Sequence, residues 1–328
     1  MQMHKVIVSS RTFGKVVSIG EELLRNNGFA VFYARTAPGT LIDEDCLAEL
    51  VKREQPYAII CGTEPITRKV LESSQNLRIV MKRGVGIDNI DLQTATSLNI
   101  AVGNAPEANK KAVAELTLGL ILALVRHLYD AIQNTKSGKW IPFIGHELNN
   151  LTIGVIGTGR IGREVIKLLH GFGAKILAYD IMPNNELAMQ YGVKYVSLDT
   201  LLKMSDIVTI HAPLTKETHH MIGQRELEMM KPSAFIINTA RGEIIDEVAL
   251  YNHLKEKKIA GAALDVFSQE PPLNNPILNL DNVIATPHMG AYTFEAMEKM
   301  DRICAETIIA FSRGEKLSNI INADMIFA

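Results

Sequence analysis

The 328-residue sequence contains little cysteine and almost no net charge. Its three cysteines, Cys46, Cys61 and Cys304, lie far apart and form no CxxC pair. This excludes a disulfide framework and a cysteine-rich metal site, and it is typical of reduced thiols in the cytoplasm. The formal net charge is −2 and no basic run occurs, so neither a nucleic acid nor an anionic membrane is an expected partner. We expect no bound metal.

Targeting and membrane-spanning segments are also lacking. The N-terminal residues MQMHKVIVSS enter a strand-like run almost at once and show no signal-peptide pattern. The longest apolar segment, 112–125, contains Glu115 and is short for a bilayer span. We therefore expect it to form a buried helix, in a protein located in the cytoplasm without a membrane partner.

An alternating pattern is present instead in the first hundred residues. Amphipathic segments separate short apolar runs at 6–8, 30–33, 58–61, 77–81 and 100–102. Such alternation predicts βαβ units and a parallel sheet with helices on both faces. A chain of this length is expected to form two domains. The sequence therefore predicts an α/β protein made of doubly wound parallel sheets.

A glycine-rich turn follows an apolar run at 151–156. Its sequence, Gly157-Thr-Gly159-Arg-Ile-Gly162, leads into a helical pattern, and a second apolar run then ends at Asp180. Gly157 permits a tight turn, Gly159 lets backbone N–H groups approach a pyrophosphate, and Gly162 allows close packing of the helix. The helix N-terminus attracts phosphate, and Asp180 is placed to bind ribose hydroxyls. The stretch predicts a dinucleotide site.

The second half of the chain contains further strands and two long helices. We expect strands at 206–210, 234–238, 262–266 and 283–285. We also expect one long helix that begins after Asn104-Ala-Pro106 and runs to about Lys136, with a packing role for Trp140 in the loop after it. A further helix over 293–313 is expected to return to the first domain. Polar residues follow the strands, and ligands of open parallel sheets bind at that edge.

Three of these strand-end residues form a chemically complete set. Arg241 offers a planar fork for a carboxylate or a carbonyl, His288 can transfer a proton near neutral pH, and Glu270 can orient the histidine and favour its protonated form. Each residue alone also fits an ordinary surface role. Together with a nicotinamide they predict a 2-oxo-acid reductase.

A second glycine pair, Gly84 and Gly86, lies in the first half of the chain. The backbone N–H groups of this loop, around Val85, can face a ligand carboxylate. A simple connection from a strand to a turn is the alternative.

Seven motifs together resemble the D-isomer-specific 2-hydroxyacid dehydrogenase family. They are GVGIDNID (84–91), NAPEANKKAVAELTLGLIL (104–122), GVIGTGRIGREV (154–165), HAPLTKETHHMI (211–222), MKPSAFIINTARGEIIDEVAL (230–250), GAALDVFSQEPP (261–272) and TPHMGAYT (286–293). The resemblance covers almost the whole chain and is closest to D-3-phosphoglycerate dehydrogenase-like members. It implies a discontinuous, flavodoxin-like substrate domain (1–103 plus 293–328), a Rossmann-type NAD domain (104–292) and a homodimer.

The resemblance also implies roles for individual residues. It assigns catalysis to Arg241, Glu270 and His288, and binding of a small 2-hydroxy or 2-oxo acid to Arg241, Lys82 and the Val85-Gly86 backbone. It implies that NAD is bound by the glycine-rich turn and Asp180, and by the residues Arg160, Ile161, Ala212, Pro213, Thr239, Ala240, Asp265 and Gly290.

The identity of the substrate stays open at this point. Relatives that act on phosphoglycerate generally carry arginine where Lys82 stands, and some carry another where Cys61 stands, so a glyoxylate or hydroxypyruvate reductase is an alternative. Formate dehydrogenases look similar but carry glutamine where Glu270 stands. An NAD-sensing protein without catalysis is the alternative from another class, and the absence of interaction segments favours an enzyme.

Overall fold

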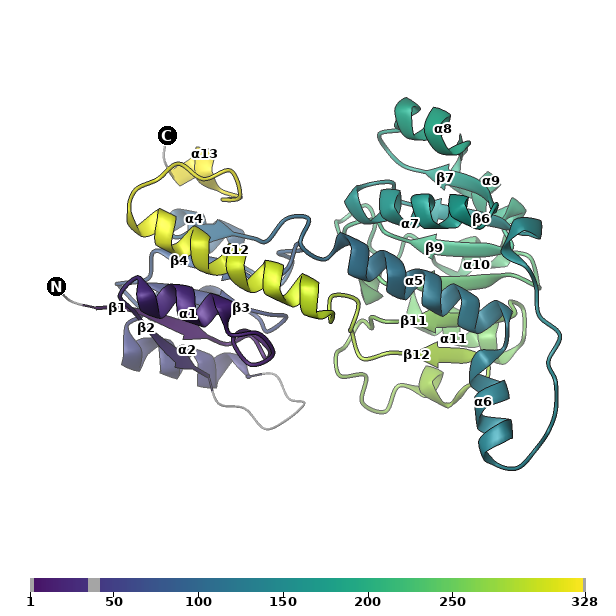
Figure 1. Ribbon diagram of the computed structural model, residues 1–328, viewed down its shortest axis with the longest axis horizontal. Coiled ribbons are helices and arrows are strands. Elements are labelled where there is room, and N and C mark those ends of the chain that lie inside the picture. The colour runs from purple at the N-terminus through teal and green to yellow at the C-terminus, as the bar shows by residue number, and fades with distance from the viewer. Residues whose placement is uncertain (1–2, 35–41, 327–328) are drawn as a thin grey trace. The chain divides into compact units, whose positions relative to one another are not determined.

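The computed structural model describes residues 3–34 and 42–326 (Figure 1). The chain forms two compact units. Unit 1 comprises Met1–Asn109 and Ala291–Ala328, and unit 2 comprises Lys110–Gly290. Domain boundaries were expected after residues 103 and 292, whereas residues 104–109 and 291–292 belong to unit 1.

Unit 1 is built on a five-stranded parallel sheet in the order β2-β1-β3-β4-β5. This is the flavodoxin-like order, in which the direction of winding changes between β1 and β3. The strands are β1 (His4–Val8), β2 (Phe29–Tyr33), β3 (Ala58–Cys61), β4 (Ile79–Lys82) and β5 (Ala101–Gly103). The helices are α1 (Ile19–Asn26), α2 (Glu44–Glu54), α3 (Arg68–Glu72), α4 (Leu92–Ser97), α12 (Phe294–Ser312) and α13 (Ala323–Ile326).

Unit 2 is built on a seven-stranded parallel sheet in the order β12-β11-β10-β9-β6-β7-β8. The strands are β6 (Thr152–Ile156), β7 (Lys175–Tyr179), β8 (Lys194–Tyr195), β9 (Ile207–Ile210), β10 (Phe235–Asn238), β11 (Gly261–Leu264) and β12 (Val283–Ala285). The helices are α5 (Lys110–Val125), α6 (Leu128–Lys136), α7 (Arg160–Gly171), α8 (Asn185–Tyr191), α9 (Leu198–Met204), α10 (Gln224–Glu228) and α11 (Glu247–Lys255), with 3-10 turns at Leu148–Asn150, Gly242–Ile244 and Pro276–Asn279. The predicted fold class is confirmed in both units.

The strands of both sheets are apolar because helices cover both of their faces. In unit 2, α5 and α7 pack against each other and bury Leu120, Ile121 and Ile166 on one face of the sheet. In unit 1, α12 packs against α1 and contributes Cys304 and Ile308 to the core.

The fully buried Asp301 of α12 forms an ion pair with Arg83, the residue after β4. The same carboxylate accepts a 3.0 Å hydrogen bond from the Gly14 backbone N–H. A buried carboxylate needs such partners to offset its lost hydration. Helix α12 is thereby tied to two loops of unit 1.

The long helix expected up to Lys136 is in fact two helices. His127 has a left-handed backbone (φ +50°), and α5 and α6 meet there at 65°. Among the described residues, no single helix is long and apolar enough to cross a membrane, although α5 and α6 together meet that test of length and composition. Trp140 was expected to pack, but its side chain is 89% exposed.

Candidate functional site

The glycine-rich turn connects β6 to α7, and its conformation depends on two close backbone approaches. Gly157 has φ +86°, and a Cβ atom there would lie 2.7 Å from the Ala212 backbone nitrogen. A Cβ atom on Gly162 would lie 2.0 Å from the Gly157 carbonyl oxygen. Gly159 precedes α7, and no protein atom lies within 4 Å of its ideal Cβ position. The protein thus leaves space beside Gly159, at the helix N-terminus where a phosphate is favoured.

Asp180 follows β7 and holds this turn from the other side. Its Oδ2 atom accepts hydrogen bonds from the Thr158 backbone N–H (2.6 Å) and hydroxyl (2.9 Å), and Oδ1 accepts one from the Met182 N–H. Burial alone would raise the pKa of Asp180, but these hydrogen bonds outweigh it and the pKa lies below its usual value. The carboxylate is therefore charged at neutral pH.

The other residues predicted to line the dinucleotide site follow neighbouring strands. Arg160 and Ile161 begin α7, Ala212 and Pro213 follow β9, and Thr239 and Ala240 follow β10. The Thr239 hydroxyl lies 2.9 Å from the hydroxyl of Thr117 on α5, which fixes its position. His211, the residue after β9, has its pKa lowered to about 3 by burial, so its ring is neutral at neutral pH.

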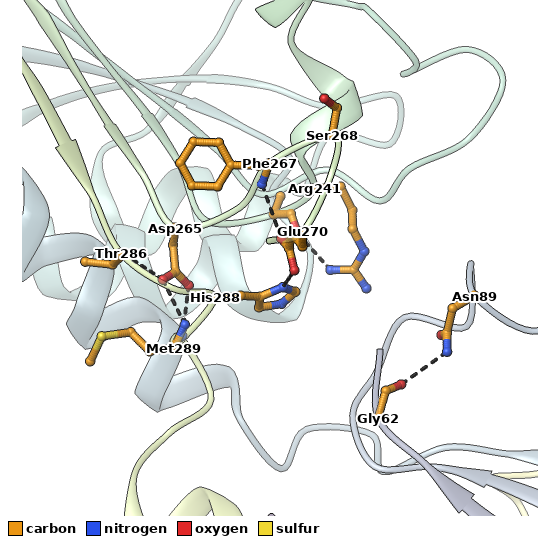
Figure 2. A network of polar contacts seen from close by, with 12 residues as sticks. Gly62, Asn89, Arg241, Asp265, Phe267, Ser268, Glu270, Thr286, His288 and Met289 are labelled. Atoms are coloured by element: carbon orange, nitrogen blue, oxygen red, sulfur yellow. Dashed lines mark hydrogen bonds and ion pairs between the residues drawn. The ribbon is translucent and has the colours of Figure 1, made fainter. Parts of the chain in front are cut away.

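Asp265, the residue after β11, is 1% exposed and holds the loop that carries His288. Its carboxylate accepts hydrogen bonds from the Thr286 hydroxyl (2.6 Å) and the backbone N–H groups of Met289 and Gly290 (both 2.8 Å). Burial raises the pKa of Asp265, although the three hydrogen bonds act to lower it. Asp265 was expected to line the cofactor site, and its contacts also hold the loop that carries His288 (Figure 2).

The side chains of His288 and Glu270 form a direct pair. His288 Nδ1 lies 2.6 Å from Glu270 Oε2, and Glu270 Oε1 accepts a 3.2 Å hydrogen bond from the Phe267 N–H. Both side chains are about one-quarter exposed, at 28% and 25%. The ring is thus oriented through Nδ1, which leaves Nε2 for another partner.

Arg241 lies beside this pair in Figure 2 because two backbone segments touch there. A Cβ atom on Gly242 would lie 2.0 Å from the Phe267 carbonyl carbon, so only glycine permits this approach. Asn238, at the end of β10, donates from Nδ2 to the Arg241 carbonyl at 2.8 Å. These two supporting residues were not assigned roles from the sequence. The sequence feature that could have identified Asn238 is its position as a polar residue at the end of a buried strand.

Of the predicted substrate residues, Lys82 ends β4 and Val85 and Gly86 follow it, all in unit 1. Lys82 is 5% exposed, and its ammonium donates to the Gly62 carbonyl and, at 2.6 Å, to Asn89 Oδ1. Asn89 in turn donates to the Gly62 carbonyl at 3.2 Å, as Figure 2 shows. Lys82 therefore connects two loops, and its contact with a substrate stays a prediction.

The site in unit 2 combines a turn suited to phosphate, a fixed acid for ribose, a guanidinium and a paired histidine. A guanidinium can bind a carboxylate, and the imidazole can donate or accept a proton. The donors and the open space beside Gly159 fit a dinucleotide.

Comparisons with known proteins agree with this chemistry. Residues 118–290 match the NAD binding domain of the D-isomer specific 2-hydroxyacid dehydrogenases. The chain is 43% identical to the D-3-phosphoglycerate dehydrogenase of Methanocaldococcus jannaschii over 98% of its own length and 60% of that protein's length. It is 41% identical to the glyoxylate reductase of Thermococcus litoralis over 84% and 86% of the two lengths.

A solved structure of D-lactate dehydrogenase from Aquifex aeolicus, in complex with NAD and lactic acid, is similar throughout. The TM-score is 0.84 at 33% identity, with 95% of this chain and 96% of that chain covered.

Replacing Gly162 by alanine should impair dinucleotide binding, because the new methyl group would collide with the Gly157 carbonyl. Such overpacking costs about 1–3 kcal/mol, so we expect the affinity for NADH to fall by about tenfold, measured by quenching of protein fluorescence. Gly171→Ala on the same helix is the control, since no atom lies within 4 Å of that Cβ position. Equal NADH affinity in both variants would contradict the proposed role of the Gly157–Gly162 contact.

Proposed function

We propose a function that follows from the family to which this chain belongs, the D-isomer specific 2-hydroxyacid dehydrogenases, which are NAD-dependent oxidoreductases that act on 2-hydroxy acids. In this proposal the chain interconverts a small 2-oxo acid and its D-2-hydroxy acid, with Arg241, Glu270 and His288 as catalytic residues. The observation that carries the proposal is the 2.6 Å contact between His288 Nδ1 and Glu270 Oε2. It gives the histidine a fixed orientation and a stabilised charged form.

His288 supplies or removes the proton in this proposal. During reduction, negative charge develops on the carbonyl oxygen, and protonated Nε2 donates to it. During oxidation the neutral ring accepts the same proton. Glu270 stabilises the imidazolium, and Phe267 N–H holds the glutamate in place.

Arg241 binds the substrate in this proposal. Its guanidinium has the geometry to hold the carboxylate and polarise the 2-oxo group. The Val85 and Gly86 backbone N–H groups are proposed to bind the substrate carboxylate as well. Unit 1 is accordingly the substrate-binding domain and unit 2 the NAD domain.

The cofactor site is proposed to consist of the glycine-rich turn with Asp180, together with Arg160, Ile161, Ala212, Pro213, Thr239, Ala240, Asp265 and Gly290. Bound NADH supplies the hydride. The N–H groups at the start of α7 would hold the pyrophosphate, and Asp180 would accept hydrogen bonds from the ribose.

Two substrate classes have support. Identity to a D-3-phosphoglycerate dehydrogenase extends over nearly the whole of this chain, which favours a phosphorylated three-carbon acid. Similarity to a glyoxylate reductase covers most of that enzyme's length, which favours glyoxylate or hydroxypyruvate.

A homodimer is proposed to form through α6 and the segment after it. No residue of α6 is buried, and the apolar side chains Leu128, Tyr129, Ile132, Trp140 and Ile144 are all more than 40% exposed. A patch of this kind is typical of an interface. The location is proposed to be cytoplasmic, since the three cysteines are free thiols and two of them are buried.

The catalytic proposal is tested by following NADH absorbance with glyoxylate, hydroxypyruvate and phosphorylated 2-oxo acids over a range of pH. Replacing His288 by asparagine should lower kcat on the order of 10²–10⁴-fold, the usual effect of losing an acid–base group. Glu270→Gln keeps the shape of the side chain but removes its negative charge beside the ring, so kcat should also fall, by less than in the His288 variant.

Unchanged NADH binding and unfolding temperature are the controls for both variants. A kcat for Glu270→Gln equal to that of the wild type would show that Glu270 does not assist His288. Wild-type protein that oxidises NADH with none of these acids would overturn the proposed activity.

The charge of Asp180 should make the enzyme prefer NAD(H) strongly over NADP(H). A 2′-phosphate would meet this carboxylate, and the next residues, Ile181 and Met182, offer no positive charge. Asp180→Ser combined with Ile181→Arg should raise kcat/KM with NADPH relative to NADH by about tenfold or more. Comparable efficiency of the wild type with both cofactors would disprove this preference.

The dimer proposal predicts that a charge in the α6 patch separates the subunits. Ile132→Asp should shift the mass measured by light scattering from dimer to monomer, because the patch would no longer be apolar. Met189→Asp on α8, where the side chain is 82% exposed, should leave the mass unchanged. A monomeric wild-type protein at micromolar concentration would refute the proposal.

A further inference from the structure

We propose that Arg11 recognises an anionic group at the far end of the substrate, either a phosphate or a second carboxylate. This inference rests on the proposed reduction of 2-oxo acids. It replaces Lys82 as the cation that determines the preference for a charged substrate, and it follows from contacts within unit 1 alone.

Arg11 lies at the carboxyl edge of the five-stranded sheet, where β1 and β3 adjoin. The backbone N–H groups of Ser9 and Ser10 both donate to the Ile60 carbonyl, at 3.0 and 3.2 Å, so the chain leaving β1 stays beside the end of β3. In doubly wound sheets of this order, ligands bind at this change of winding between β1 and β3. The register places Arg11 at the position where a ligand is expected.

The loop that carries Arg11 is held on both sides of it. The Ser9 hydroxyl donates to Glu64, the Thr12 hydroxyl accepts a 2.7 Å hydrogen bond from Arg83 Nη1, and the Gly14 N–H donates to Asp301. Phe13 is completely buried. The backbone around Arg11 is therefore fixed before any ligand binds, which lowers the entropy lost on binding.

The two cations at the end of β4, Lys82 and Arg83, already have protein partners. Lys82 donates to Gly62 and Asn89, and Arg83 binds Asp301 and Thr12. Arg83 Nη2 has no hydrogen-bond partner but is enclosed within the protein, and its side chain is only 4% exposed. Neither residue can extend its charge toward a substrate without breaking these contacts.

Arg11 differs from both of them. Its side chain is half-buried, and within residues 3–34 and 42–326 it has no hydrogen-bond or ion-pair partner. A guanidinium that is partly removed from water favours an anion, which it can bind through two parallel N–H groups. Glu64, the nearby carboxylate, is fully buried and is bound by the Ser9 hydroxyl and the Gly62 N–H, so it faces the interior loops.

The test compares KM and kcat of wild type and Arg11→Ala for three kinds of 2-oxo acid: glyoxylate, 2-oxoglutarate with a carboxylate tail, and 3-phosphooxypyruvate with a phosphate tail. A charge-assisted bidentate contact contributes enough for a change on the order of 10- to 100-fold. We expect Arg11→Ala to raise KM by this factor for one or both tailed acids, with an effect at least tenfold smaller on glyoxylate. The tailed acid that loses more identifies the anion.

Lys15→Ala is the matched control, because Lys15 is an exposed cation on the same loop and should leave the ratio of tailed to untailed activity unchanged. Arg11→Lys should restore only part of the affinity. A wild type that reduces glyoxylate but does not prefer any tailed acid would overturn the role of Arg11 while leaving the proposed activity intact. An equal loss for all acids in Arg11→Ala would do the same. A wild type inactive with every acid would instead overturn the proposed function.

Discussion

Asp265 accepts three hydrogen bonds from a single loop, and the position of His288 depends on them. The bonds come from Thr286 on one side of the histidine and from Met289 and Gly290 on the other. His288 itself has a left-handed backbone, with φ +51°, a conformation that costs on the order of 1–3 kcal/mol and requires support from its surroundings. A carboxylate that is almost completely buried provides this support, and in turn the loop's N–H groups stabilise its charge. The position of His288, the proposed proton donor, is thus set by the sheet, since Asp265 directly follows β11.

Close backbone contacts at two glycines bring the rest of the site together. Gly162 touches the Gly157 carbonyl, and Gly242 touches the Phe267–Ser268 backbone. The first contact shapes the turn that is proposed to bind the pyrophosphate, and the second sets Arg241 beside the segment that carries Glu270. Neither contact adds a functional group to the site. Both determine where the functional groups of neighbouring strands lie.

Much of this arrangement could be predicted from the sequence. The alternation of apolar runs indicated the parallel sheets, and the glycine pattern with Asp180 indicated the turn, because these features are local and periodic. The pairing of His288 with Glu270 was also expected from their positions after strands. The break at His127 was not predicted, since apolar periodicity continues through it and the left-handed residue is a histidine rather than glycine. The two-residue strand β8 (Lys194–Tyr195) is too short to show a pattern.

The partners of individual charges were harder to predict. In the sequence, Lys82, Arg83 and Arg11 are all cationic residues near the end of a strand, and only their tertiary contacts distinguish them. Asp301, which binds Arg83, is 218 residues away along the chain. No local pattern signals a pairing over such a distance, so the sequence favoured Lys82 as the cation for the substrate.

That separation also sets an order of events during synthesis on the ribosome. At elongation rates of about 5–20 residues per second, Arg83 emerges on the order of 10–40 seconds before its counterion on α12. The whole of unit 2 is synthesised during that interval. Meanwhile the five strands of unit 1 lack the packing of α12, and Gly14 lacks its hydrogen bond to Asp301. Unit 2 can complete its own core first, because its elements are continuous from Lys110 to Gly290. The nascent N-terminal segment must therefore wait for α12, and until then Arg83 lacks its ion-pair partner and one sheet face is only partly covered.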